Sequence, residues 1–115
     1  MSKRKVITMR FVKGEKLFIR IDRKAEETTM TDQDFQDHLA YVEKLARERY
    51  LLGGGFSNTD GGMLLFEAEN IDEARKISNS DPIIERGFYK CEVFEWELVV
   101  LTETFLEREA DDFRK

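Results

Sequence analysis

Every odd position from Leu17 to Ile21 is aliphatic, whereas the even positions from Lys16 to Asp22 are polar except for Phe18. Successive side chains of a β-strand point to opposite faces, so this pattern predicts a strand with one apolar face and one mixed face. The run from Val6 to Val12 is also strand-like, and Lys13-Gly14-Glu15 separates it from the first. We therefore expect these two runs to form a β-hairpin.

A helical pattern follows from Thr31 to about Tyr50, where three glycines come soon after. Thr31 is a good N-cap, and Asp34 places negative charge at the positive end of the helix. Apolar residues recur at helical spacing, so this helix should lie on a sheet. His38, the single histidine of the chain, falls within the same stripe. The apolar members of the stripe are Phe35, Leu39, Val42, Leu45 and Ala46.

The next two segments are predicted strands. Leu51 to Phe56 contains three consecutive glycines, which leave room on one side of the chain. Met63 to Ala68 is apolar at both odd and even positions apart from Glu67, as expected of a strand that is covered on both faces.

The last third of the chain predicts a short helix from Asn70 or Asp72, a turn, a strand and a second helix. Pro82 is favoured in the first turn of a helix, so Asp81 is expected to cap a turn that runs through Glu85. Phe88 to Val100 is a long strand. The tail from Thr102 has apolar residues at helical spacing and predicts a docked terminal helix.

From Lys16 onward the predicted order is strand, helix, strand, strand, helix, strand. Right-handed crossovers fold this order into an α+β, ferredoxin-like βαββαβ unit, a four-stranded antiparallel sheet with both helices on one face. We expect one domain over residues 1–115 with its core at about 16–100. The bare face, to which we assign Phe18, would be a large apolar patch that a homodimer could bury by face-to-face packing of two sheets.

Composition narrows the possible partners. With 24 acidic and 19 basic residues the net charge is −5, which disfavours nucleic acid, and the segment Gly62 to Phe66 lacks the basic and paired aromatic residues that stack on bases. One cysteine cannot form an internal disulfide, and no signal peptide or membrane span is apparent, so we expect a cytoplasmic protein. One histidine and one cysteine cannot form a zinc site, and we expect no metal or cofactor.

His38 carries the strongest chemical signal. An ionisable ring on an apolar helix stripe needs a polar partner, and Asp81 could supply it and fix the imidazole tautomer. A general acid or base would result. The structural alternative is a satisfied core histidine, with Asp81 serving only as a helix cap.

Four further residues are candidate ligand contacts. Gly54 and Gly55 could bring backbone amides near a ligand, although a tight passage between helix and strand also explains the glycines. Tyr41 could reach the mouth of a cleft, and a solvated position explains it equally well. Trp96 could line a pocket, but core or dimer-interface packing is the commoner role of such a residue.

Four features in register resemble the YciI-like (YCII-related) family of small dimeric α+β barrel proteins. The resemblance covers roughly Lys16 to Val100. The features are His38-Leu39-Ala40-Tyr41-Val42, Leu51-Leu52-Gly53-Gly54-Gly55, the run Glu67 to Ala74 with its terminal Asp81-Pro82, and Phe94-Glu95-Trp96.

The resemblance implies a ferredoxin-like dimer with a cleft in which His38 faces Asp81 as an active site. The leading hypothesis is therefore an enzyme that performs lyase, isomerase or dehalogenase-type proton chemistry on an unknown small molecule. The alternative is a non-catalytic dimeric module that binds a ligand or a protein.

Overall fold

The computed structural model describes residues 6–7, 13–26, 28–101 and 108–109. The chain divides into two compact units. One is Lys16–Trp96, and the other comprises Met1–Glu15 together with Glu97–Lys115.

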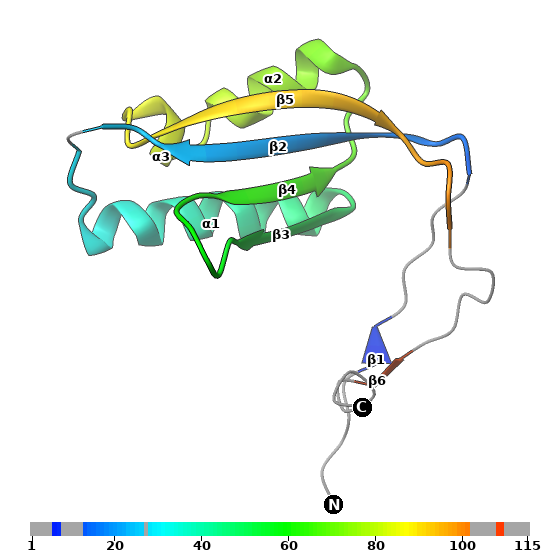
Figure 1. Ribbon diagram of the computed structural model, residues 1–115, viewed down its shortest axis with the longest axis horizontal. Coiled ribbons are helices and arrows are strands. Elements are labelled where there is room, and N and C mark those ends of the chain that lie inside the picture. The colour runs from blue at the N-terminus through cyan, green and yellow to red at the C-terminus, as the bar shows by residue number, and fades with distance from the viewer. Residues whose placement is uncertain (1–5, 8–12, 27, 102–107, 110–115) are drawn as a thin grey trace, which may run out of the picture. The chain divides into compact units, whose positions relative to one another are not determined.

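The larger unit has the predicted α+β, ferredoxin-like order. Its strands form one four-stranded antiparallel sheet in the order β3-β4-β2-β5, and α1 and α2 lie behind the sheet in Figure 1. The elements are β2 (Lys16–Lys24), α1 (Asp32–Glu48), β3 (Leu51–Gly55), β4 (Gly62–Phe66), α2 (Ile71–Asn79), α3 (Pro82–Glu85) and β5 (Tyr89–Glu97).

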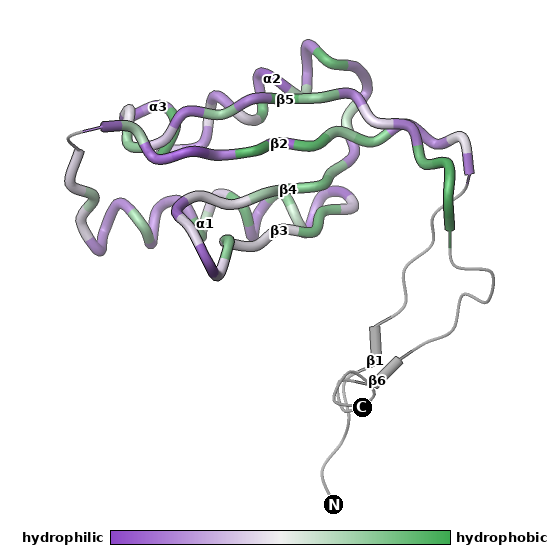
Figure 2. The backbone as a smooth tube through the Cα atoms, viewed as in Figure 1, coloured by the Kyte–Doolittle hydropathy of each residue, from purple (hydrophilic) through white to green (hydrophobic). Residues whose placement is uncertain are grey.

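The helices begin where the sequence predicts because side chains satisfy their first backbone N–H groups. The Thr31 hydroxyl accepts from the Asp34 backbone, and the Asp34 carboxylate accepts in return from the Thr31 backbone, which forms a capping box. Asn70 caps α2 by accepting from Glu73. Figure 2 shows hydrophobic and hydrophilic residues mixed along α1, as expected of a helix with one buried face.

The register of the sheet places three cross-strand rows of residues on the face that packs against the helices. Phe18, Leu64 and Phe66 of these rows form the core cluster with Ala74 from α2, and Val42 from α1 packs on it. The rows are Leu51–Phe66–Phe18, Gly53–Leu64–Arg20 and Gly55–Gly62–Asp22.

Our assignment of Phe18 to the bare face is therefore wrong. Phe18 is 2% exposed beneath the helices, and the even positions of β2, including Arg20 and Asp22, face the core. The half-buried Ile19 and Ile21 of β2 lie on the opposite, open face instead. This arrangement is stable because Arg20 and Asp22 are paired with each other, so two charges can be buried on the core side.

The open face of the sheet carries a set of exposed or half-exposed hydrophobic side chains. Val93 of β5 packs on the core, so the even positions of that strand point to the open face. Ala46 of α1 is also exposed and does not belong to the buried stripe. The open face comprises Ile19, Ile21, Leu52, Met63, Leu65, Phe94 and Trp96.

In the smaller unit, β1 (Val6–Ile7) pairs antiparallel with β6 (Arg108–Glu109). The predicted hairpin is wrong at Val6–Ile7, because both edges of β2 are already occupied by β4 and β5. The predicted terminal helix is wrong at Arg108–Glu109, where the backbone pairs with another strand. The remainder of both predictions, at residues 8–12 and over most of the tail, lies outside the described residues.

Candidate active site

Asp81 is held at the start of α3 by the backbone that follows it. Pro82 opens this helix, and the Ile83 backbone N–H donates to Asp81 Oδ1 at 3.1 Å. The carboxylate is completely buried. The predicted cap is confirmed, yet one backbone donor cannot by itself satisfy a buried charge, so the other contacts of this carboxylate matter.

His38 lies against that carboxylate from the middle of α1. Its Nδ1 is 2.8 Å from Asp81 Oδ2 and 2.9 Å from Oδ1. A carboxylate only accepts, so Nδ1 carries the hydrogen that it donates. Nε2 is then the ring atom that can exchange a proton with a ligand. The His38 side chain is 17% exposed and is therefore not sealed in the core.

Arg20 completes a buried network that our sequence analysis missed. Its Nε donates to Asp22 Oδ1 at 2.7 Å and its Nη2 to Asp22 Oδ2 at 2.8 Å. The same Nη2 is 3.0 Å from Asp81 Oδ2, and the guanidinium is fully buried. Arg20 therefore bridges the two carboxylates, one on β2 and one at the start of α3. The signal lay in the sequence: Arg20 and Asp22 are two residues apart and share one face of a strand.

These contacts set the charge of the site. Burial alone would raise the pKa of Asp81, but the hydrogen bond from His38 and the positive charge of Arg20 outweigh it, and the pKa lies below its ordinary value. Burial would likewise lower the pKa of Arg20, but its ion pair with Asp22 outweighs this and the pKa is raised. Asp81 is thus a carboxylate, and Arg20 is a cation, at neutral pH.

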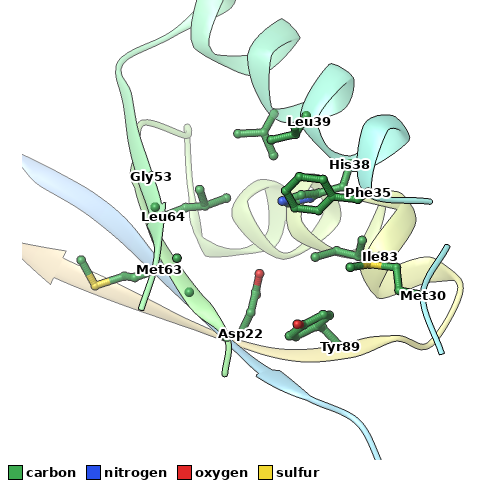
Figure 3. A pocket seen from close by; sticks show the side chains of 15 residues that line it. Asp22, Met30, Phe35, His38, Leu39, Gly53, Met63, Leu64, Ile83 and Tyr89 are labelled. Carbon is green, nitrogen blue, oxygen red and sulfur yellow. The ribbon is translucent and has the colours of Figure 1, made fainter. Parts of the chain in front are cut away.

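A cavity of about 260 Å³ lies beside His38 (Figure 3). It exists because the third row of the sheet has a side chain on only one of three strands: Gly55 and Gly62 leave the space next to Asp22 empty. The rest of the wall is mostly apolar, with Phe35 and Leu39 from α1 among the lining residues. The site therefore combines a hydrophobic enclosure with a few polar groups, as ligand sites usually do.

The predicted ligand contacts divide into two pairs. Gly54 and Gly55 line the cavity. Tyr41 does not line the cavity, and its hydroxyl donates instead to the backbone carbonyl of Ile77 at 2.7 Å. Burial and the nearby Asp81 charge raise the pKa of this phenol. Trp96 lies on the open face of the sheet, 39% exposed, and does not line the cavity. Asp22 and Tyr89 are lining residues that the sequence analysis missed.

Arg86 braces the two elements that carry the histidine and the aspartate. From the end of α3 its Nη1 donates to Asp34 Oδ1 and to Asp37 Oδ2, both at 2.8 Å, in the first turns of α1. This brace ties the α1 segment just before His38 to the helix that Asp81 caps. Such exposed ion pairs stabilise a fold weakly, so their main effect is on the relative position of the two helices.

Within the described part of the chain, no group of three or more histidine, cysteine, aspartate or glutamate side chains is placed to hold a metal ion. A search of the same residues for a helix long and apolar enough to span a membrane gives none.

The family model of the YCII-related domain matches residues 16–97. The chain belongs to the YCII-related family. It is 32% identical over 76 residues to the uncharacterized protein YjpA of Bacillus subtilis (strain 168), an alignment that covers 62% of this chain and 89% of YjpA.

A solved structure of this fold is that of TftG, the 5-chloro-2-hydroxyhydroquinone dehydrochlorinase of Burkholderia phenoliruptrix AC1100, in complex with 2,5-dihydroxybenzoquinone. It superposes with a TM-score of 0.59 and 24% identity and covers 70% of this chain and 93% of TftG. At this identity the likeness shows the fold alone.

Proposed function

We propose that this YCII-related protein is a small-molecule enzyme in which His38 is the general acid or base and Asp81 orients it. One observation carries the proposal: the Asp81 carboxylate holds His38 Nδ1 at 2.8 and 2.9 Å, while the same imidazole lines a cavity. A base with a fixed tautomer, oriented by a buried carboxylate, is the arrangement that general acid–base catalysis requires.

The chemistry follows from the free ring atom. Neutral His38 has a lone pair on Nε2, which takes a proton from an acidic C–H or O–H group of the ligand. The resulting imidazolium is stabilised by the Asp81 carboxylate, and it returns the proton to a developing anion or to water. Proton transfer of this kind is the common step of lyase, isomerase and dehalogenase-type reactions.

The size and lining of the cavity favour a small ligand. Its volume of about 260 Å³ lies just below the range of roughly 300–1,000 Å³ that is usual for ligand pockets. TftG is a dehydrochlorinase of a chlorinated hydroxyhydroquinone, and the ligand in its complex is a dihydroxybenzoquinone, so both molecules are hydroxylated six-membered rings. We propose a small cyclic organic molecule for this chain as well.

A crystal soaked in a mixed library of small cyclic metabolites would identify ligands, and turnover of each bound compound would then be compared between the wild type and His38→Ala. Loss of a general acid or base lowers the rate by about 10²- to 10⁴-fold, and we expect the variant to bind the ligand but not convert it. Binding without turnover by the wild type, or turnover that His38→Ala leaves unchanged, would indicate a non-catalytic module and contradict the proposal.

We also propose that the open face of the sheet is a homodimer interface. Leu52, Met63, Phe94 and Trp96 are 39–46% exposed on one face, and an apolar patch of this kind is unusual on a monomer. Light scattering should give twice the mass of one chain at micromolar concentration. A monomeric mass would refute the dimer and leave the cavity chemistry untouched, because His38 and Asp22 contact the cavity from the helix-covered side of the sheet.

A further inference from the structure

Asp22 has no role in the proposed proton transfer, yet it is the one side chain among the paired residues Gly55, Gly62 and Asp22 of β3, β4 and β2. It is 6% exposed, lines the cavity beside Gly55 and Gly62, and in Figure 3 its carboxyl group points into the cavity. Each oxygen accepts one hydrogen bond from Arg20. A carboxylate has about four acceptor sites, so Asp22 keeps acceptor capacity for a ligand.

The charges around the cavity restrict what that ligand can be. Among the described residues the lining contains no lysine and no arginine. Arg20 is not a lining residue and is paired with the carboxylates of both Asp22 and Asp81, so the three groups together carry one net negative charge. While His38 is neutral, an anionic ligand would meet a carboxylate in a poorly solvated space with no lining lysine or arginine to offset the repulsion.

We infer that Asp22 selects the ligand of this cavity: it accepts a hydrogen bond from a hydroxyl group and thereby favours uncharged, hydroxyl-bearing molecules over anions and over molecules without a donor. Hydrogen bonds to a charged acceptor are stronger than neutral ones, and a site built around an acceptor disfavours analogues that leave it unpaired.

The geometry gives such a ligand two polar contacts and an apolar body. In Figure 3 Asp22 and the His38 ring lie on different sides of the cavity, with Phe35 and Leu39 near the ring. A hydroxylated ring can donate to Asp22 at one position and present a second group to His38. The inference deepens the proposed function, because it names the ligand class of the same cavity, and it rests on that proposal only in taking the cavity as the ligand site.

The test is a binding series on the untagged wild-type chain. Hydroquinone, catechol and resorcinol are compared with 1,4-dimethoxybenzene, which lacks donors, and with 2,5-dihydroxybenzoate, which adds a negative charge. A hydrogen bond to a charged group changes the Kd by about 10- to 100-fold, so at least one of the three diols should bind tenfold or more tightly than both comparison compounds. Equal or tighter binding of either comparison compound, or no binding of any diol, overturns the inference.

Two variants then assign the effect to Asp22. Asp22→Asn keeps the shape but loses the charge, and we expect the Kd of the preferred diol to rise about tenfold while the benzoate binds no more weakly than before. Gly55→Leu is the matched cavity control: a Cβ at Gly55 meets only the Gly61 carbonyl, at 3.7 Å, so the larger side chain extends into the cavity and should abolish binding of all probes.

Unchanged selectivity in a folded Asp22→Asn protein overturns the assignment. If Asp22→Asn does not fold because Arg20 loses its partner, the wild-type series still decides. His38→Ala separates the two proposals: retained diol selectivity without any His38-dependent turnover would refute the enzyme alone. His38-dependent turnover of ligands without hydroxyl donors would refute the role of Asp22 alone.

Discussion

Replacement of Asp81 by asparagine tests whether the buried network is held by charge. The variant keeps the side-chain oxygen that caps α3 but removes the negative charge between Arg20 Nη2, at 3.0 Å, and His38 Nδ1, at 2.8 Å. Loss of one partner of a buried ion pair costs about 3–5 kcal/mol. Arg20 keeps both bonds to Asp22, so we expect the lower end of that range, about 3 kcal/mol.

That loss is a large part of the stability of a domain of this size, which is about 5–15 kcal/mol. The variant should still fold, with a thermal midpoint lower by on the order of 10–20 °C. Urea unfolding followed by circular dichroism measures the difference in free energy. Asp72→Asn is the matched control, because the Asp72 side chain is 89% exposed and the loss of its charge in the first turn of α2 should cost less than about 1 kcal/mol.

The pH dependence of the free energy of unfolding is a second, independent test of the role of the Asp81 charge. The pKa of Asp81 is below the ordinary 3.8 in the folded protein, so its ionised form is stabilised by folding. This contribution is fully present above pH 3.8 and is lost as the pH falls below that value toward the lowered folded pKa. The difference in the free energy of unfolding between the wild type and Asp81→Asn should therefore become smaller over that pH range. A gap of less than about 0.5 kcal/mol at pH 7, or one that does not change with pH, would refute the reasoning.

Four further changes have distinct expected outcomes. Arg86→Ala removes the ion pairs between α3 and α1. The loss in turnover of any identified substrate, expressed as a free energy, should exceed the loss in the free energy of unfolding; the reverse order would contradict a positioning effect. Tyr41→Phe removes one hydrogen bond to Ile77 and should cost about 0.5–1.5 kcal/mol without changing ligand affinity, since Tyr41 does not line the cavity; calorimetry of the ligand checks this. Trp96→Glu should shift the mass by light scattering to that of one chain, whereas a persistent dimer would place the interface elsewhere. Thr31→Ala removes the capping box of α1 and should cost about 1 kcal/mol; an unchanged urea midpoint would contradict this.

The elements of the larger unit could be predicted from local signals. Thr31 and Asn70 mark the starts of α1 and α2 through their own hydrogen bonds, and Asp81-Pro82 marks the start of α3. The strand–helix order then allows few topologies. The contact between His38 and Asp81 could be predicted on two grounds. A polar side chain on an apolar helix face needs a polar partner, and the family resemblance indicates Asp81 as that partner.

The orientation of β2 could not be derived from alternation alone. Its odd positions from Leu17 to Ile21 are aliphatic and its even positions include Phe18, so either face could have been buried. The choice depends on whether Arg20 and Asp22 find partners inside, and that depends on Asp81, far away in the sequence. The cavity was hidden for a similar reason, since the row that contains Gly55 and Gly62 is defined only by the pairing register.

The short strand β1 was assigned to the wrong neighbour because its hydrophobic pattern does not identify a partner. A strand adjacent in sequence is the usual partner, but β2 lies between β4 and β5 and has no free edge. Edge availability is a property of the assembled sheet, so local sequence could not supply it.

The most direct test is the imidazole ¹⁵N spectrum of the untagged protein, in which His38 is the single histidine and its signals need no assignment. At a pH where the ring is neutral, we predict that the hydrogen is on Nδ1, donated to Asp81, and that Nε2 is unprotonated and changes its shift when a ligand enters the cavity. A neutral ring with its hydrogen on Nε2 would contradict the account, because the nitrogen that faces the ligand would then have no lone pair to accept a proton.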